Sequence, residues 1–358
     1  MKSFVVFSDL HLHQWQYGST IVNGRNSRLE QQKEVVKSIV RYCSDRDISE
    51  VVFCGDLYHT SNISAEVSQA AYEAFSGFKK AKINLTIIVG NHDQSSRSGE
   101  THALGFFREL GRLVEFGAGR DHEDVHQRDI RIHGIHANLL PFTDERAQLE
   151  RWLSKTRGGF IFMHQGVGGV EVNSKGFTLN EILTPDMVPD SCAMAFTGHY
   201  HSHRAVTSNL IIPGSTVQLN WGDQNETRGW LDVKIEGDKV HEIELVPSNA
   251  SQFVTISEED VESMVGSVPG NFIRVLSKGG YSPDELTAYL MGNGAASVEI
   301  KQAVVAQPVS KIEAKSLLSF TDMVMSYATA KEHAGVINAY DKEVGEALLK
   351  GNYQPPSV

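Results

Sequence analysis

The sequence predicts a layered α/β protein, and three observations lead to that prediction. In residues 1–165, short apolar runs rich in β-branched and aromatic residues alternate with helical patterns. Residues 194–245 contain short strand-like runs joined by turns, which predicts a second sheet, mostly antiparallel. A polar stretch near residues 247–251 then separates this part from a smaller segment with renewed strand–helix alternation.

The first 165 residues contain five short runs with the composition of buried strands. These runs are Phe4–Phe7, Val51–Cys54, Leu85–Val89, Ile130–His133 and Phe160–Met163. Helical spacing of apolar residues, with Ser64 as a capping residue for the second segment, predicts helices between them. The expected helices are Arg28–Tyr42, Ser64–Phe78 and Glu145–Lys155.

The remainder of the chain is expected to hold further strands and two smaller parts. The strands expected before the polar stretch are Met194–Thr197, Arg204–Thr207, Leu210–Ile212, Trp230–Ile235 and Val240–Leu245. Those expected beyond it are Phe253–Ile256, Phe272–Leu276 and Ser297–Ile300, with helices starting near Ser257 and Ser282. We therefore predict domains at residues 1–248 and 249–318, then C-terminal helices and a loose tail at residues 319–358.

Composition narrows the class of protein. The 358 residues are 41% apolar and 22% charged, as in ordinary globular proteins. No apolar run approaches the ~20 residues of a membrane span, and the three cysteines are scattered, so we expect a cytoplasmic protein without a membrane partner. The net charge of −11 counts against tight autonomous binding of nucleic acid. It leaves open a local basic groove, metal-assisted phosphate binding or a partner that supplies the grip.

Polar side chains follow five of the predicted strands. The segments concerned are Asp9-Leu10-His11, Gly55-Asp56, Gly90-Asn91-His92-Asp93, His164-Gln165 and Gly198-His199-Tyr200-His201. If the strands lie side by side, these groups converge on one edge of the sheets. Carboxylates and imidazoles gathered there without a cation would pay a desolvation and repulsion cost of several kcal/mol, which a metal removes.

The mixture of Asp, Asn and His suits Mn, Fe or Zn better than a purely oxygen-bound Mg or Ca. The number of groups exceeds what one ion needs. With Asp56 as a bridge they would serve two ions about 3.5–4 Å apart, the geometry for displacement at phosphorus. We therefore expect two divalent ions, with Mn favoured and Mg, Fe or Zn as alternatives.

The order D-x-H, GD, GNHD, H, GHxH over residues 1–245 resembles the calcineurin-like metallophosphoesterases. The resemblance implies an α/β/β/α sandwich with a small α/β capping domain and C-terminal helices. It also implies the roles of particular residues. Asp9, His11, Asp56 and His201 would hold one ion. Asp56, Asn91, His164 and His199 would hold the other, and His92 would protonate the leaving oxygen.

His59, in Gly55-Asp56-x-x-His59, and Pro213-Gly214-Ser215 are similar to the nuclease branch of that superfamily. This branch comprises the SbcD-type subunits of double-strand-break repair complexes and their phage counterparts. The resemblance implies Mn-dependent 3′-to-5′ exonuclease and single-strand endonuclease activity on DNA, with His59 handling the strand. It further implies an SMC-like coiled-coil ATPase partner, docked by the C-terminal helices, a homodimer, and a host-cytoplasmic location if the protein is viral.

Two alternatives stay open from the residues. The acidic balance favours a small substrate, such as a cyclic nucleotide or a phosphomonoester. A non-catalytic scaffold would have no need for seven metal-binding side chains. The loop containing Gln14-Trp15-Gln16-Tyr17 departs from the compact family pattern. Its aromatic rings could stack on bases, although a packed loop is the simpler interpretation.

Overall fold

The computed structural model describes residues 1–96, 101–114, 130–171 and 178–303. Residues Met1–Gln302 form one compact unit and Ala303–Val358 a second. The predicted C-terminal helices and tail lie outside the described residues. None of the described helices has the length and apolar character that a membrane span needs.

The first sheet has six strands in the order β14-β13-β1-β4-β5-β6. Its strands are β1 (Lys2–Phe7), β4 (Glu50–Phe53), β5 (Asn84–Ile88), β6 (Arg112–Val114), β13 (Gly229–Glu236) and β14 (Lys239–Pro247). Strands β1, β4, β5 and β6 are parallel, whereas β13 runs antiparallel to β1 and to β14.

The second sheet also has six strands, in the order β11-β12-β10-β9-β8-β7. Its strands are β7 (Ile130–Ile132), β8 (Ile135–Leu140), β9 (Gly159–His164), β10 (Cys192–Gly198), β11 (Arg204–Thr207) and β12 (Leu210–Ile212). The four central strands are parallel, and the two edge strands pair antiparallel.

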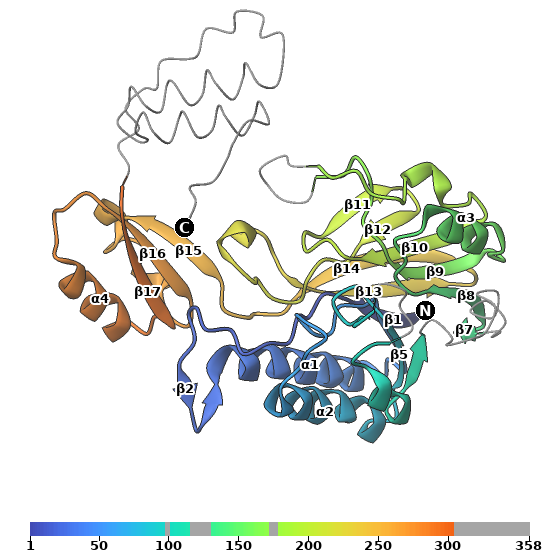
Figure 1. The fold of residues 1–358 in the computed structure, drawn as a ribbon, viewed down its shortest axis with the longest axis horizontal. Helices are drawn as coiled ribbons and strands as arrows, with labels where there is room; N and C mark the ends of the chain where they lie inside the picture. Colours follow the sequence, from blue (N-terminus) through green and yellow to red (C-terminus); the bar gives the residue numbers. More distant parts are fainter. Residues whose placement is uncertain (97–100, 115–129, 172–177, 304–358) are drawn as a thin grey trace, which may run out of the picture. The chain divides into compact units, whose positions relative to one another are not determined.

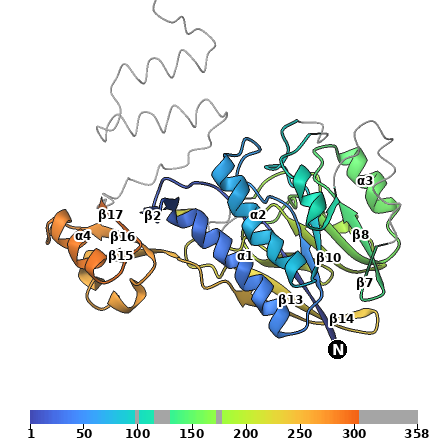
Figure 2. The same ribbon diagram turned by 90° about the horizontal axis from the view of Figure 1, so that it is seen from below.

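The two sheets face each other across an aromatic core (Figure 1). Phe4 of β1 lies 5.0 Å from Phe160 of β9, between ring centroids, and 6.1 Å from Phe196 of β10. Helices α1 (Ser27–Asp45) and α2 (Ala65–Lys80) pack side by side on the outer face of the first sheet (Figure 2). Helix α3 (Arg146–Ser154) covers the outer face of the second. The layers are therefore α/β/β/α, as predicted.

The three helices arise where the sequence indicates. Asn26 caps α1 by accepting hydrogen bonds from the backbone of Arg28 and Leu29, each at 3.1 Å. Ser64 caps α2, as expected. The apolar stripe of α2, including Phe75 and Phe78, is buried against the first sheet. This stripe is therefore part of the core.

The prediction of a mostly antiparallel second sheet over residues 194–245 is wrong. β10 pairs parallel with both β9 and β12, and β13 and β14 belong to the first sheet. Strand β13 is buried on both faces: Leu231 faces the core between the sheets, while Trp230 contacts Tyr42 of α1. Sequence reasoning also missed β8 and β6. Strand pairing joins distant segments, which local patterns do not reveal.

A smaller sheet of parallel strands follows, comprising β15 (Phe253–Ser257), β16 (Phe272–Ser277) and β17 (Ser297–Gln302). Helix α4 (Pro283–Gly292) packs on it and carries a capping box at Ser282 and Glu285. The helix expected at Ser257 is only a 3₁₀ turn, Glu258–Asp260. A hairpin of β2 (Ile21–Val22) and β3 (Arg25–Asn26) precedes α1. The predicted domain boundaries stay a prediction.

Candidate metal centre

The polar segments singled out in the sequence follow β1, β4, β5, β9 and β10. Strands β1, β4 and β5 are parallel in the first sheet, and β9 and β10 are parallel in the second. Parallel strands bring their carboxyl ends to the same edge of a sheet, where active sites of α/β proteins are built. The two sheets therefore present these residues to one another.

The backbone at the strand ends adopts an uncommon conformation. The φ angles of Asp9, His11 and Asp56 are 52°, 47° and 57°, in the left-handed region that non-glycine residues seldom occupy. Hydrogen bonds between the loops hold this conformation: the amide of Asp9 donates to Gly55 O at 3.0 Å, and that of His11 to Asp56 O at 3.1 Å. Such strain clusters at functional sites because the surrounding structure maintains it.

Two glycines leave space for the proposed ligands. A Cβ atom on Gly90 would lie 2.2 Å from Oδ1 of Asp56, and one on Gly55 would lie 2.4 Å from Nδ1 of His164. Any side chain at either position would displace a proposed ligand. The glycines in these motifs therefore serve the close approach of neighbouring loops.

Asp9, His11 and His201 form the first group, with potential ligand atoms all within 4.8 Å of one another. Nε2 of His201 lies 3.1 Å from Nε2 of His11. The same His11 nitrogen lies 3.9 Å from Oδ1 of Asp9 and 3.7 Å from Oδ2 of Asp56. Imidazole nitrogens and carboxylate oxygens thus surround one small volume.

Asp9, Asp56 and His164 form a second group within the same limit. Nε2 of His164 lies 3.3 Å from Oδ2 of Asp56 and 3.0 Å from Oδ1 of Asn91. The same Asn91 oxygen lies 3.0 Å from Nδ1 of His199. All seven predicted metal ligands are therefore brought together, with the Asp56 carboxylate near both groups.

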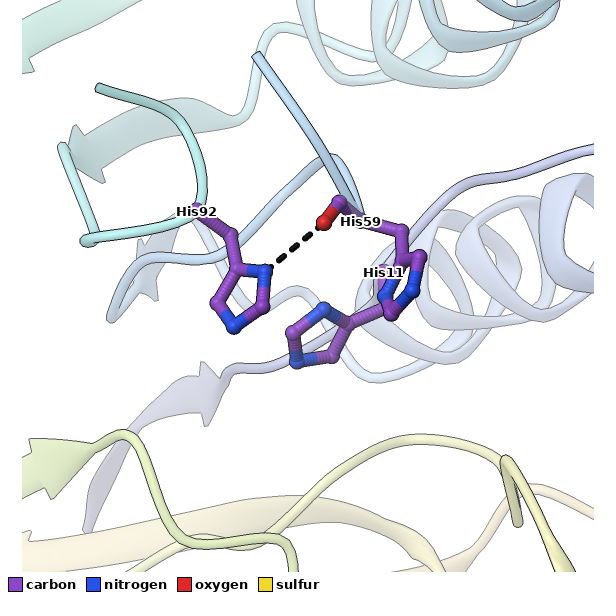
Figure 3. Close-up of side chains that lie close together, drawn as sticks. All are labelled: His11, His59 and His92. Carbon is purple, nitrogen blue, oxygen red and sulfur yellow. Dashed lines mark hydrogen bonds between the residues drawn. The ribbon is translucent and has the colours of Figure 1, made fainter. Parts of the chain in front are cut away.

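The two predicted catalytic histidines lie beside these groups. His11, His59 and His92 form a third cluster, also within 4.8 Å (Figure 3). Nδ1 of His92 lies 2.7 Å from the backbone oxygen of His59. Because a carbonyl oxygen only accepts hydrogen bonds, Nδ1 of His92 carries the hydrogen, and its Nε2 is left to face the site.

Burial controls the charges at the centre, where Asp9, His11, Asp56 and His164 are each at most 2% exposed. Burial raises the pKa of Asp9 and lowers that of His11. Burial alone would raise the pKa of Asp56, but the adjacent imidazoles, His164 foremost, outweigh it and hold that pKa well below its usual range. For His164, burial is likewise outweighed, by Asp56 and Asp9, and its pKa rises to about 9.

These residues fit a pair of divalent cations. The His164 proton is the positive charge that balances the buried carboxylates when no ion is bound, and an ion can take its place. Neutral His11 presents a lone pair, as a metal ligand must. Burial, followed by the neighbouring histidines, lowers the pKa of His59 to about 4, so its ring is neutral at pH 7.

Asp93 belongs to one of the predicted motifs, but sequence reasoning gave it no role. The carboxylate of Asp93 is buried and accepts hydrogen bonds from four backbone amides, those of Asp56, Leu57, Tyr58 and Gly90. It thereby ties the loop after β4 to the loop after β5. The signal that marks it is its place three residues after Gly90, in a run that already contains two site residues.

The loop whose role was open lies against the site. The ring of Trp15 is 4.5 Å from that of His59, and His13 contacts both rings. The guanidinium of buried Arg28 lies 4.9 Å from the Trp15 ring. Trp15 is thus packed in the loop, and base stacking by this ring stays a prediction.

Comparison with known proteins gives the class to which this fold and site belong. The description of the calcineurin-like phosphoesterase family matches residues 2–203, more than half of the chain. The chain therefore belongs to that family. The family indicates a metal-dependent phosphoester hydrolase, and the histidine and aspartate groups described above could hold its divalent ions.

Particular relatives are nucleases and repair proteins at low identity. The chain is 35% identical to the SbcD component of the nuclease SbcCD of Bacillus subtilis over 89 residues, 25% of this chain and 22% of that protein. It is 25% identical to the DNA double-strand break repair protein Mre11 of Archaeoglobus fulgidus, over 77% of this chain and 65% of that protein. These two alignments therefore span less than two thirds of each relative's length.

A further relative aligns almost from end to end. The SbcD component of the nuclease SbcCD of Staphylococcus epidermidis is 20% identical over 95% of this chain and 92% of that protein. Among solved structures, a dimetal phosphatase from Danio rerio has a TM-score of 0.39 at 11% identity, covering 69% of this chain and 99% of that chain.

Proposed function

We propose that this phosphoesterase is a two-metal-dependent DNA nuclease with 3′-to-5′ exonuclease and single-strand endonuclease activity. The observation that carries the proposal is the cluster of His11, His59 and His92 directly beside the carboxylate–imidazole groups. A second histidine at the rim gives the site an additional group for a long substrate. The names of the aligned nuclease components support the same activity.

In this proposal two groups of four side chains hold the ions and share Asp56. Asp9, His11, Asp56 and His201 form one set. Asp56, Asn91, His164 and His199 form the other. Two bound ions, which we expect to be Mn, would activate a water for attack on phosphorus and neutralise charge on the phosphate oxygens.

The histidines at the rim supply proton transfer and substrate contact. The hydrogen bond from Nδ1 of His92 to the His59 carbonyl leaves Nε2 of His92 to hold the proton that passes to the leaving 3′ oxygen. The neutral ring of His59 contacts the DNA strand. Because the orienting bond uses the backbone of His59, changing its side chain leaves the His92 ring in place.

The same proposal includes an SMC-like coiled-coil ATPase as partner, a homodimer and a cytoplasmic location. The repair-complex names of the relatives support the partner. A partner also answers the charge problem, because a chain with net charge −11 lacks the positive field that holds nucleic acid. Light scattering across micromolar concentrations tests the dimer, since a constant monomeric mass would rule it out.

The function is tested by incubating the purified chain with Mn²⁺ and an end-labelled duplex, and separately with cyclic nucleotides. Asp56→Ala and His92→Ala serve as controls. Stepwise shortening of the duplex that both controls lose supports the nuclease. Faster turnover of the cyclic nucleotide contradicts it and favours the small-substrate alternative, to which the acidic charge of the chain is suited.

A further inference from the structure

Glu181 is a charged side chain beside the proposed metal centre that neither the motifs nor the family resemblance singled out. It lies between β9 and β10, and its Oε1 atom is 3.7 Å from Nε2 of His199. The two side chains are 23% and 21% exposed, so solvent only partly screens the contact. Tyr200 also donates a hydrogen bond to the same carboxylate oxygen, at 3.5 Å.

The imidazole of His199 is held on three sides. Phe142 stacks on its face, with centroids 6.1 Å apart and planes 18° from parallel. Nδ1 lies 3.0 Å from Oδ1 of Asn91, another proposed ligand, and Nε2 faces Glu181. The nitrogen that points into the site is therefore Nδ1, and the outer nitrogen meets a carboxylate.

The chain leaves space for Glu181 to reach this position. A Cβ atom on Gly166 would lie 2.5 Å from Cδ and 2.7 Å from Cγ of Glu181. Gly166 does not occupy the left-handed region of φ, so an alanine there would be excluded by this contact alone and not by its backbone. The glycine after His164 and Gln165 thus admits the Glu181 side chain.

His164 shows the same arrangement with a different outer partner. Its Nδ1 donates to the backbone oxygen of Cys54 at 2.6 Å, which leaves Nε2 for the site. Histidines that bind metals usually donate their other ring N–H to a carbonyl or carboxylate, which fixes the tautomer and raises ligand basicity. For His199 the acceptor is a side chain, so substitution can test it.

We propose that Glu181 is a positioning residue that holds His199 with its Nδ1 lone pair directed at the metal centre, by accepting the Nε2 hydrogen. The inference rests on the proposed two-metal function. Glu181 acts through His199 alone and belongs to the set formed by Asp56, Asn91, His164 and His199. Removing Glu181 therefore weakens one ion and spares the other.

Calorimetric titration of the metal-free full-length chain with MnCl₂ tests this. Glu181→Ala should weaken one of two binding events by about 10–100-fold and leave the other unchanged. Glu181→Gln, whose amide oxygen can still accept the hydrogen, should recover most of that loss. Glu150→Ala is the matched control, because Glu150 is an exposed carboxylate on α3 paired with Arg146 at 2.8 Å.

Gly166→Ala supplies an independent test, because it displaces the Glu181 side chain without removing its charge. Alone it should weaken the same binding event as Glu181→Ala. Added to Glu181→Ala it should cost little more, because the atoms it would strike are gone. Thermal unfolding of the metal-free variants shows whether each still folds, and Glu181→Gln serves if Glu181→Ala does not.

The outcomes separate the inference from the function on which it rests. Loss of affinity for one ion in both single variants, without additivity in the double variant, supports the role of Glu181. Two binding events with wild-type affinity in Glu181→Ala overturn that role and leave the two-metal centre standing. A wild-type chain that binds no Mn²⁺ overturns both. Equal weakening of both ions contradicts the assignment to one set.

Discussion

The proposed centre has a buried half and a rim, and the two are built differently. Asp9, His11, Asp56 and His164 are at most 2% exposed and sit on strand ends fixed by left-handed backbone and loop-to-loop hydrogen bonds. His59 and His92, on the rim, are only partly buried and are held by a backbone carbonyl and by aromatic packing.

This difference teaches which half carries which task. Charges in the buried half cannot be screened by water, so the carboxylates need a cation, either the His164 proton or a metal ion. The rim stays accessible, and its histidines are free to meet a substrate. We therefore expect substitutions in the buried half to remove metal, and those at the rim to remove turnover with the metal retained.

The largest effect is expected for Asp56→Ala, which removes the carboxylate near both ligand groups. Each ion supplies several kcal/mol of charge stabilisation and tenfold corresponds to about 1.36 kcal/mol, so the activity should fall by at least about 10⁴-fold. The metal content of the purified variant, measured by atomic emission, should fall as well. A variant that keeps both ions would break the distinction between the halves.

His92→Ala should show the opposite combination. Removing a general acid typically costs about 10²–10⁴-fold in rate, whereas no proposed ligand is lost. Turnover of labelled DNA and metal content measured on the same preparation check this. Full activity in this variant would refute the role of His92, and loss of metal would move His92 into the buried half.

The metal-free chain should lose stability as the pH rises. The pKa of His164 is about 9 in the folded chain, against an ordinary value of 6.5. The folded chain thus holds this proton more tightly than the unfolded chain does. The resulting stabilisation is complete below about pH 6.5 and is lost as the pH rises through about 9, a change on the order of 3 kcal/mol.

Urea unfolding of the metal-free chain at several pH values between about 6 and 10 measures this loss. With Mn²⁺ in excess the loss should be much smaller, because the ion replaces the proton as the balancing charge. Equal slopes with and without Mn²⁺ would show that the ion does not bind at His164.

Trp15→Ala should have the smallest effect. Its ring supports the His59 ring, and a small displacement of a functional group costs about tenfold in rate. In a His59→Ala background the same substitution should cost almost nothing further, because it acts through that ring. A rise in KM for single-stranded DNA that persists in the double variant would instead identify Trp15 as a base-stacking residue.

Much of the site could be predicted because its residues follow strands that are recognisable locally. The run Val51–Cys54 before Asp56 and the run Phe160–Met163 before His164 have unmistakable strand composition. Parallel pairing then forces their ends together. The helices were equally local, because Ser64 and the stripe containing Phe75 mark α2 by capping and by spacing.

What could not be predicted depends on contacts between distant segments. Strand β13 joins β1, at the other end of the domain in sequence, through pairs such as Lys2 with Ile235. Glu181 meets His199 only because the chain folds back beside Gly166. No local pattern marks either contact. A lone glutamate in a polar stretch is ordinarily a solvated residue.

The most direct test of the central claim is anomalous diffraction at the manganese edge from crystals of the full chain soaked in Mn²⁺. Two peaks about 3.5–4 Å apart are expected, with Asp56 between them. Asp9, His11 and His201 should surround one peak, and Asn91, His164 and His199 the other. A single peak, or peaks away from these side chains, would contradict the two-metal centre.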